Sequence, residues 1–388
     1  MKIHRVAVVG CGALARAAHL KNCQANPRIE LAAVCDIEPR AAESAKTDFG
    51  ARRAETDWRK IVADPAIDLC ILATHTELRG AFIVPALEAG KAVYTEKPLA
   101  PSRREMMDIV LASRRTGRPV CVGHNRRSSP AMREFKRLFS KAATGPRGTA
   151  SPVDRMEGRD FIPEELTRQV LMRINDDSRS WKAWTLFDEE GMMHAEMVHF
   201  IDLALWLNAP LIPVRVFAEG SPRGNFSILI RFADGSLTTL QHSLVGHFGY
   251  PKELMEGTAR NITVAMDQHI EVRQIGMEDE PVRRYFPYAA ECGWAKEPGM
   301  AGYIAEYERE WNRAKTAGEP ARWLNVNKGH YEHLDRFLDH IEGKSENPCD
   351  VDSAVAVNRI ALKILDSARS GQALPVHPED WHIPRLGS

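Results

Sequence analysis

A lysine between a carboxylate and a proline is the first candidate for acid–base chemistry in this sequence. Lys97 stands in Glu96-Lys97-Pro98, directly after the apolar run 92–95, which we predict to be a strand. Pro98 has no backbone N–H for a sheet, and it restricts the residue before it to extended geometry. Lys97 is therefore held on a stiff backbone at the carboxyl edge of the strand, which a merely solvated lysine would not require. A lysine whose pKa is lowered can accept a proton.

A second set of polar side chains lies on a predicted helix, residues 191–207. At about 100° per residue, Glu196, His199 and Asp202 share one arc with Trp206, while the rest of the helix is apolar. A helix with so narrow a polar face is buried except where it meets a cavity or another polar surface. His199 titrates near neutral pH and is a candidate base. The competing interpretation is a core helix with local salt bridges, and it is strongest for Asp202.

A glycine-rich turn near the amino terminus predicts a phosphate site. The apolar run 3–9 is followed by the pattern G-x-G-x-x-A and then by Ala-rich sequence with good helix propensity. In such a strand–turn–helix unit Gly10 permits the sharp turn, Gly12 admits a pyrophosphate close to the backbone, and Ala15 lets the helix pack closely on the strand. The free N–H groups at the helix start attract the phosphate charge.

A carboxylate follows this turn at the spacing that dinucleotide binding requires. The apolar run 29–35 ends in Asp36, about 20 positions after the turn, where it could bind an adenosine ribose. Asp36 favours NAD, because the 2′-phosphate of NADP would meet a negative charge, but Arg40 softens this preference and NADP stays possible. For Asp36 alone, the competing interpretation is an ordinary strand-end residue. The expected cofactor contacts are Gly10, Cys11, Gly12, Ala13, Leu14, Asp36, Ile37, Arg40, Ala73, Thr74, His75 and Thr76.

Strands and helices alternate as far as residue 123. This alternation predicts a right-handed, mostly parallel Rossmann-type α/β sheet. Ligands lie at the carboxyl ends of such strands, so we expect residues 73–76 to line the cofactor crevice; the alternative is a loop that touches nothing. Further strands are expected at 68–73, 92–95 and 119–123, and helices at 40–49, 58–63, 78–89 and 102–116.

Beyond about Gly145 the pattern changes to consecutive strands. This predicts a second α+β domain on a large open, mostly antiparallel sheet, with a D-G hairpin at 233–236. We place the domains at 1–124 and 125–388, and the C-terminal helices could pack back on the first. The segments 155–177 and 247–257 are expected as pocket loops. Strands are expected at 149–157, 214–219, 226–232, 236–244, 261–265 and 270–274.

The composition excludes several classes of partner. The 52 basic and 52 acidic residues cancel, so there is no broad electrostatic case for nucleic acid or an anionic membrane. No apolar run approaches the roughly 20 residues of a membrane span, and no signal peptide is expected. The seven cysteines are scattered and favour reduced thiols in a cytoplasm. His330, His333 and Asp335 lack the spacing of a zinc site, so we expect a polar helix face there and no metal.

In this order and spacing the motifs resemble the glucose-fructose oxidoreductase and inositol dehydrogenase (Gfo/Idh/MocA) family over nearly the whole chain. The resemblance implies a nucleotide domain, an α+β domain whose open sheet often joins subunits into a homodimer or homotetramer, and hydride transfer on sugars, cyclitols or related compounds. The matching pieces are residues 10–15, Glu96-Lys97-Pro98, Asn125-Arg126-Arg127 with Pro130, Trp181-Lys182, and Gly191 followed by His199-Phe200-Ile201-Asp202-Leu203.

The resemblance also implies roles for individual residues. The lysine of E-K-P lies by the nicotinamide and the substrate hydroxyl, which corresponds to Lys97, and the helix histidine corresponds to His199. Many members carry Asp four residues before that histidine, where this chain has Ala195; Glu196 matches a subgroup that also carries N-R-R-x-x-P. Whether Glu196 points at substrate or at Lys97 stays open. Further expected contacts are Glu96, Lys97 and Asn125 to the cofactor, and Asn125, Arg126, Trp181 and Asp202 to the substrate.

Oxidation of an alcohol requires a base within hydrogen-bond reach of its oxygen. We expect Lys97 and His199 both to contact that oxygen, with Glu196 orienting them and Arg126 holding polar or anionic parts of the substrate. Burial beside oxidised nicotinamide would lower the pKa of Lys97, and His199 is the alternative base. The expected partner is a small polyol, sugar or sugar derivative. Two other functions fit: an NAD-dependent, redox-assisted glycoside-cleaving enzyme, and a cofactor-binding regulator without turnover, which the retained Lys97 and His199 disfavour.

Overall fold

The computed structural model describes residues 2–149, 168–181, 185–186, 190–221, 223–290, 293–294, 298–322 and 324–381. The chain forms two compact units, each assembled from separate stretches of sequence. The first consists mainly of Met1–Ser128 and Gly329–Asn358, and the second of Ser129–Lys328 and Arg359–Asp380. The strand expected at 149–157 lies almost entirely outside the described residues.

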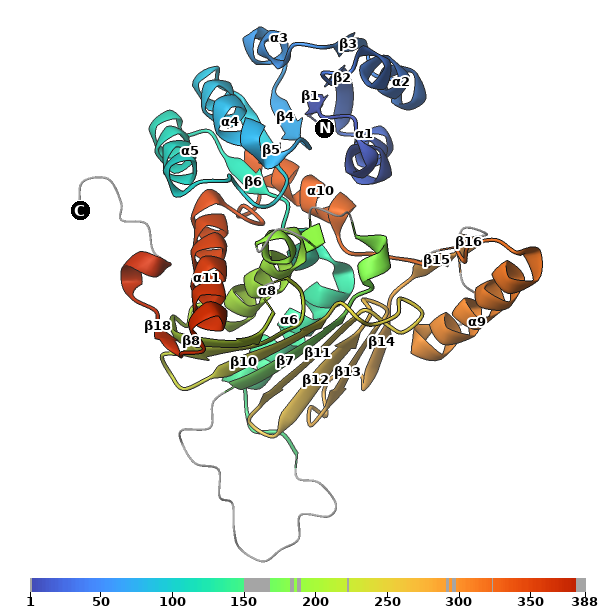
Figure 1. The fold of residues 1–388 in the computed structure, drawn as a ribbon, viewed down its shortest axis with the longest axis vertical. Coiled ribbons are helices and arrows are strands. Elements are labelled where there is room, and N and C mark those ends of the chain that lie inside the picture. The colour runs from blue at the N-terminus through green and yellow to red at the C-terminus, as the bar shows by residue number, and fades with distance from the viewer. Residues whose placement is uncertain are drawn as a thin grey trace, which may run out of the picture. The chain divides into compact units, whose positions relative to one another are not determined.

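Six parallel strands form the sheet of the first unit, in the order β3-β2-β1-β4-β5-β6 (Figure 1). The order reverses between β1 and β4, which is the topology of a doubly wound dinucleotide-binding sheet. The predicted Rossmann-type sheet is therefore confirmed. Its strands are β1 (His4–Val9), β2 (Ile29–Cys35), β3 (Arg53–Glu55), β4 (Leu69–Leu72), β5 (Ala92–Thr95) and β6 (Val120–Val122).

The crossover helices of this unit begin and end at local signals in the sequence. Ser102 caps one of them by accepting a hydrogen bond from Glu105 N at 3.2 Å. Gly117 ends this same helix and Gly50 ends another, both at positive φ, where a side chain would be strained. The helices are η1 (Ala15–His19, a π-helix), α1 (Leu20–Ala25), α2 (Pro39–Phe49), α3 (Trp58–Ala63), α4 (Arg79–Glu88) and α5 (Arg103–Thr116).

Two hydrophobic cores cover the two faces of the first sheet. Alternate residues of β1 enter different cores, so the cores lie on opposite faces. Residues 349–355 contribute to the core that contains α4 and α5. Leu334, Phe337 and Leu338 of α10 (His330–Ile341) contribute to the other, which contains α1. The first unit therefore uses chain from beyond residue 328 to complete both of its cores.

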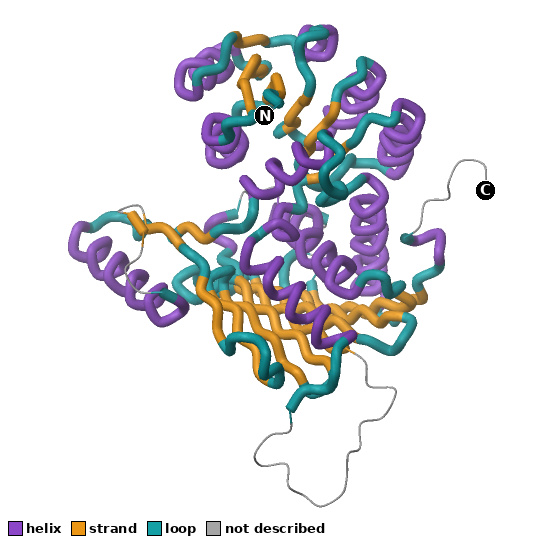
Figure 2. Tube along the Cα trace, turned by 180° about the vertical axis from the view of Figure 1, so that it is seen from behind, coloured by secondary structure: helices purple, strands orange, loops and turns teal. Residues whose placement is uncertain are grey.

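A nine-stranded sheet, part of the orange strands of Figure 2, forms the second unit. Its strand order is β14-β13-β12-β11-β7-β10-β9-β8-β18. Only the central pair, β7 and β10, runs parallel, so the predicted mostly antiparallel sheet is confirmed. The strands are β7 (Arg168–Asn175), β8 (Pro213–Gly220), β9 (Phe226–Phe232), β10 (Leu237–Ser243), β11 (Glu253–Ala259), β12 (Ile262–Asp267), β13 (Glu271–Ile275), β14 (Arg283–Tyr285) and β18 (Leu374–Pro375).

Helices cover one face of this sheet. Phe139 of α6 (Pro130–Thr144) packs on Gly257 so closely that a Cβ there would lie 2.7 Å from the ring. The predicted helix at 191–207 is present, but it contains a π-helical segment, η5 (Met193–Met197), directly before α8 (Val198–Asn208). The remaining helices are α9 (Gly299–Ala317), beside a small sheet of β15 (Tyr288–Ala290), β16 (Gly293–Trp294) and β17 (Asn325–Val326), and α11 (Val351–Ser370).

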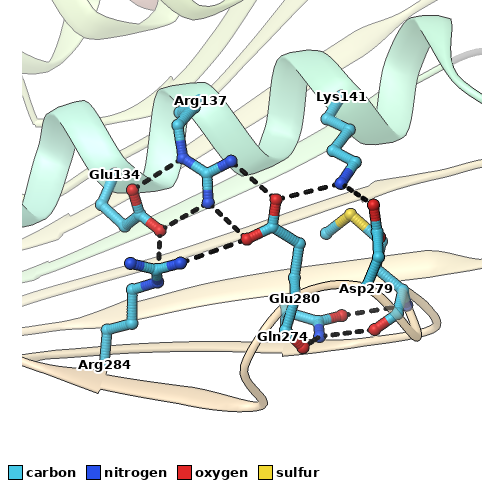
Figure 3. Close-up of polar contacts among 8 residues, drawn as sticks. Glu134, Arg137, Lys141, Gln274, Asp279, Glu280 and Arg284 are labelled. Atoms are coloured by element: carbon cyan, nitrogen blue, oxygen red, sulfur yellow. Dashed lines mark hydrogen bonds and ion pairs between the residues drawn. The ribbon is translucent and has the colours of Figure 1, made fainter.

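Ion pairs tie α6 to the β13–β14 hairpin (Figure 3). Arg137 makes a two-pronged contact with Glu280, at 2.7 and 2.6 Å, and Lys141 Nζ lies 3.0 Å from the same carboxylate. Arg284 contacts Glu280 at 3.2 Å and Glu134 at 2.7 Å. Hydrogen bonds from Arg137 and then Lys141 lower the pKa of Glu280 from 4.5 to about 2. The hairpin is thus held to the helix by a charged network.

Two segments expected as loops contain strands instead. Segment 155–177 includes β7, and segment 247–257 includes most of β11. In β7 only Val170, Met172 and Ile174 are buried, and the other face carries mainly polar side chains. In β11 the buried positions include Glu253 and Gly257, so the apolar alternation that marks a strand is missing. The placement of these two strands was therefore wrong in our sequence analysis.

Candidate functional site

The turn after β1 has a backbone shape that only glycine adopts readily. Gly10 has φ +93°, and a Cβ on it would lie 2.6 Å from the carbonyl oxygen of Ala73. A Cβ on Gly12, by contrast, would meet no atom within 4 Å. The sharp turn therefore requires Gly10, while the space beside Gly12 is open to a ligand. This arrangement fits a pyrophosphate held against the backbone.

Asp36 lies at the carboxyl end of β2 and contacts this turn directly. Its Oδ2 accepts a hydrogen bond from Cys11 N at 2.7 Å, and its Oδ1 accepts one from Glu38 N at 3.0 Å. Asp36 therefore orders the turn as well as presenting a carboxylate beside it. The Cys11 thiol is buried, and burial together with the charge of Asp36 raises its pKa to about 11. It stays protonated at neutral pH and is not a nucleophile.

Two large apolar side chains near this turn are exposed. Leu14 is 45% and Ile37 is 85% accessible to solvent, in a unit whose other apolar side chains are mostly buried. Such side chains beside a phosphate turn suit the flat ring of a nucleotide. Residues 73–76 follow β4 at the same edge of the sheet, and Ala73 adjoins Gly10 through its carbonyl group. The residues present therefore fit a dinucleotide.

Glu96 and Lys97 follow β5 at this carboxyl edge. Glu96 is buried, and its Oε1 lies 2.9 Å from Nε2 of His19 in η1. Its Oε2 accepts a hydrogen bond from the backbone N of Lys97 at 3.3 Å, and Lys97 itself is half-buried. Burial would raise the pKa of Glu96, but the hydrogen bond and charge of His19, with the charges of Lys97 and His330, lower it to about 2. The carboxylate is thus ionised and is held against the backbone N–H of Lys97.

Asn125 and Arg126 are buried in the short helix η3 (Asn125–Ser128) after β6. Asn125 Nδ2 lies 3.4 Å from Nδ1 of His330.

The expected polar helix face is wrong for His333, which is fully buried between Ser128 Oγ at 2.8 Å and the carbonyl oxygen of Val122 at 3.0 Å. Burial lowers the pKa of His333 to about 3, so it is neutral. Its two bonds fix the ends of β6 and η3.

In the second unit, Glu196 belongs to a buried group of charged and aromatic residues, which we call the Glu196 cluster. Lys252 Nζ lies 2.9 Å from a carboxylate oxygen of Glu196 and 2.9 Å from one of Asp176. Trp181 Nε1 donates to the other oxygen of Asp176, Oδ1, at 2.9 Å. His242 Nε2 lies 3.6 Å from Oδ2, the oxygen that Lys252 contacts. Burial raises the pKa of Asp176, but hydrogen bonds from His242 and Lys252 lower it overall.

The predicted residues of the 191–207 helix are all buried. Glu196 is in the π-helical segment, whereas His199 and Asp202 are in α8, with exposures of 7% and 0%. Within the second unit the carboxylate of Glu196 pairs with Lys252, a partner that the sequence did not suggest. Trp181 joins the same cluster, as a substrate contact would, while Lys182 lies outside the described residues.

Sequence reasoning missed the partners of both carboxylates. His19 is 77 residues from Glu96, and Lys252 is 56 residues from Glu196. Asp176 and Lys252 directly adjoin β7 and β11, the two strands that were also missed. Correct assignment of those strands would have brought the two residues together, because β7 and β11 are neighbours.

Comparisons with known proteins agree with this architecture. Residues 4–124 match the model of the GFO_IDH_MocA oxidoreductase family, with an NAD-binding Rossmann fold. Among curated proteins, the inositol 2-dehydrogenase of Acidothermus cellulolyticus is 25% identical over 330 residues, which cover 82% of this chain and 87% of that protein.

Solved structures share the fold over almost the whole chain. An oxidoreductase domain protein from Kribbella flavida has a TM-score of 0.72 at 18% identity, covering 97% of this chain and 100% of that one. The WlbA dehydrogenase from Bordetella pertussis, solved with NADH and UDP-GlcNAcA, has a TM-score of 0.67 at 19% identity, covering 97% and 98%. Among the described residues, every helix is too short or too polar to cross a lipid bilayer.

Proposed function

Because the chain belongs to the Gfo/Idh/MocA oxidoreductase family, we propose that it is an NAD-dependent dehydrogenase of sugars, cyclitols or their derivatives. The reaction is hydride transfer between nicotinamide and a secondary alcohol or ketone. The observation that carries this proposal is Lys97, half-buried at the edge of a dinucleotide-type sheet, with the ionised Glu96 fixed behind it.

Bound NAD would supply the hydride acceptor in this reaction. Gly10, Gly12 and Cys11 would hold its pyrophosphate, Asp36 its ribose, and Leu14 and Ile37 would flank its adenine. Asp36 supports NAD over NADP, because its carboxylate would repel a 2′-phosphate. Because the positive charge of the exposed Arg40 offsets part of this repulsion, we also expect some use of NADP. Comparing kcat/KM for the two cofactors in Asp36→Ala tests this preference, which should relax toward NADP.

We assign Lys97 the role of proton acceptor in alcohol oxidation. As hydride leaves the carbon, the hydroxyl proton passes to the Lys97 amine, and the lysine returns it in ketone reduction. Glu96, Lys97 and Asn125 are proposed cofactor contacts, and Ala73, Thr74, His75 and Thr76 line the cofactor crevice. Arg126 and Asn125 are proposed to bind polar groups of the substrate.

The second unit is proposed to contribute His199, Glu196, Trp181 and Asp202 to substrate recognition. His199 is the alternative proton acceptor. Glu196 acts with Lys252, since the two charges hold each other in place. If His199 is the base, kcat should fall further in His199→Ala than in Lys97→Ala. The acid limb of the pH profile of kcat should also move in His199→Ala.

We also propose that the open face of the nine-stranded sheet joins subunits into a homodimer or homotetramer. Residues of β9 and β10 are alternately buried and exposed, so one face lies open. Leu171 on β7, which is 40% exposed, and Ile275 on β13, which is 64% exposed, add apolar surface to the unit. Light scattering during gel filtration tests this directly, and a monomer at micromolar concentration contradicts it.

The central experiment measures NADH absorbance with a panel of sugars, inositols and sugar acids, using NAD and NADP. Lys97→Ala should lower kcat by about 100- to 10,000-fold, the usual contribution of a general base. Calorimetry should show that this variant still binds NAD, with an affinity that falls far less than kcat does, because the phosphate turn and Asp36 are intact. Lys60→Ala, a lysine 65% exposed on α3, is the matched control and should keep full activity. No turnover of any polyol despite NAD binding would favour the regulator, and a broken glycosidic bond without net NADH would favour redox-assisted cleavage.

A further inference from the structure

The second unit contains a cavity that no residue of the proposed reaction lines. It lies between α9 and the loop that joins β10 to β11, and its volume is about 360 Å³. This volume is near the lower end of the range of about 300–1,000 Å³ for small-molecule sites, and it suits a single ring. We call it the aromatic cavity; it is lined by His247, Gly249, Tyr307, Glu308, Trp311 and Asn312.

Aromatic rings form the walls of the aromatic cavity. The rings of Tyr307 and Trp311 lie 27° from parallel, with centroids 6.3 Å apart, and the His247 ring meets Trp311 edge-on at 5.5 Å. Trp311 is 46% exposed, which is unusual for so large an apolar side chain. Flat, partly exposed rings of this kind stack on the apolar face of another ring.

The polar groups around the cavity favour a neutral ligand with hydroxyl groups. An adjoining cavity of about 240 Å³ shares His247, Tyr307 and Trp311 and adds Asp177, Arg179 and Arg322 to the lining. With Glu308, the two carboxylates and two guanidinium groups cancel in formal charge. Arg179 is itself held by Asp177 through a hydrogen bond of 2.8 Å from its Nε. Because their positive and negative charges balance, these groups can donate and accept hydrogen bonds without favouring a charged ligand.

Phe248 connects the lining of the adjoining cavity with the Glu196 cluster. The Phe248 ring lines the adjoining cavity, and its centroid lies 5.6 Å from Lys252 Nζ. Lys252 in turn pairs with Glu196. On the other side, Ser180 lines the same cavity and is followed by Trp181 of the cluster. A ligand that spans both places therefore needs a second ring.

From these shared and adjacent residues, and resting on the proposed function, we infer that the aromatic cavity is a second sugar-ring subsite. It takes a neutral hexopyranose ring that stacks on Trp311 and Tyr307 and is linked to the sugar that is oxidised. The substrate class is then a disaccharide or other glycoside, rather than a free monosaccharide.

The test measures sugar binding to the NAD-loaded enzyme by calorimetry and saturation-transfer NMR. The probes are D-glucose, D-galactose, cellobiose, maltose and lactose. At least one disaccharide should bind tighter than the monosaccharides. Trp311→Ala should weaken that binding by about fivefold, the value of one aromatic stacking contact, and Trp311→Phe should restore most of it. Monosaccharide and NAD binding should stay within twofold of wild type.

Two further variants separate the subsite from general damage. Gly249→Ala should also weaken disaccharide binding, because a Cβ there would lie 2.4 Å from the Tyr307 hydroxyl and push that ring. Tyr250→Ala is the matched control, since Tyr250 is 61% exposed in the same loop and stacks on Arg173 instead. Its disaccharide affinity should be unchanged.

Several results would overturn the subsite. One is that no disaccharide binds more tightly than the monosaccharides, and another is that Trp311→Ala leaves disaccharide affinity unchanged. Tighter binding of phenyl β-D-glucoside alone would assign the cavity to an apolar ring instead. Binding is measured without turnover, so an enzyme that binds disaccharides through Trp311 but oxidises none of them would support the subsite and reject the proposed function.

Discussion

Nε2 of His19 lies 2.9 Å from Oε1 of Glu96, and both side chains are buried. The other carboxylate oxygen of Glu96 accepts the backbone N–H of Lys97. We therefore expect His19 to act on Lys97 through Glu96, as a positioning residue that contacts neither the cofactor nor the substrate in the proposed reaction.

The first prediction concerns His19→Ala. Loss of the imidazole leaves Glu96 buried without its main stabilising contact, so the backbone of Lys97 should shift and kcat should fall by about 10- to 100-fold. KM for NAD should change little, because the phosphate turn is intact. Steady-state kinetics measure both, and His19→Gln should recover part of kcat through its amide donor. A kcat within twofold of wild type would show that His19 does not position Lys97.

The pH dependence of the same pair has a definite sign. The pKa of Glu96 is lowered from 4.5 to about 2, so its contribution to stability is present above pH 4.5 and is lost as the pH falls through about 2. His19→Ala should raise that pKa and move acid unfolding to higher pH. Urea unfolding at a series of pH values measures the shift. Identical acid profiles for the two proteins would exclude the linkage.

The second prediction separates the two glycines of the phosphate turn. Gly10→Ala should lose about 1–3 kcal/mol of stability, because φ +93° is strained for alanine and its Cβ would meet Ala73. Gly12→Ala should fold normally, since space surrounds that position, yet bind NAD weakly because its methyl group would occupy the place of the pyrophosphate. Thermal unfolding and NAD calorimetry should give opposite rankings for the two variants. Unchanged NAD affinity in Gly12→Ala would remove the pyrophosphate from this turn.

The third prediction concerns Lys252, the cation of the Glu196 cluster. Lys252→Met leaves Asp176 and Glu196 buried without their shared positive charge and should cost about 3–5 kcal/mol of stability at pH 7. The deficit should shrink in acid as Asp176 takes up a proton, because Lys252 is, after His242, one of the contacts that lower the pKa of this carboxyl. Lys141→Met, on the surface of α6, is the control and should cost much less, because an exposed ion pair contributes little to stability. Equal losses in the two variants would contradict a buried network.

The fourth prediction concerns the ion pairs between α6 and the β13–β14 hairpin (Figure 3). Glu280→Gln should lower the free energy of unfolding by about 1 kcal/mol in low salt. The loss should largely disappear in 1 M salt, where the Debye length falls to about 3 Å. It should also disappear toward pH 2, because the pKa of Glu280 is lowered from 4.5 to about 2. A loss that is independent of salt would contradict an electrostatic role for this carboxylate.

Local patterns made the first unit predictable. The turn at Gly10, the strand that ends at Glu96 and the helix that Ser102 caps are each set by residues within a few positions. Parallel strands buried on both faces are continuous apolar runs, so five of the six described strands were found with only small errors at their ends. The short edge strand β3 was missed, because its three residues are half-buried and two of them are charged.

Contacts between distant residues set the limit of that reasoning. His19 reaches Glu96, and Lys252 reaches Glu196, only because strands far apart in sequence pair or pack. The strand β11 buries Glu253, which pairs with His269 at 2.9 Å, so its inner face carries charge where apolar residues are expected. Buried polar networks of this kind break the periodicity from which strands are recognised.

The first unit draws on residues 329–358 to finish both of its cores, and this bears on how the protein can be dissected. A fragment ending near residue 128 would keep every strand of the parallel sheet, yet it would lose the leucines and phenylalanine of α10 and expose the side chains beneath them. Such a fragment should aggregate on expression. Fusing residues 329–358 to it through a flexible linker should instead give a folded first unit. Isolating the first unit therefore requires joining residues 1–128 to residues 329–358, because a single truncation removes part of both cores.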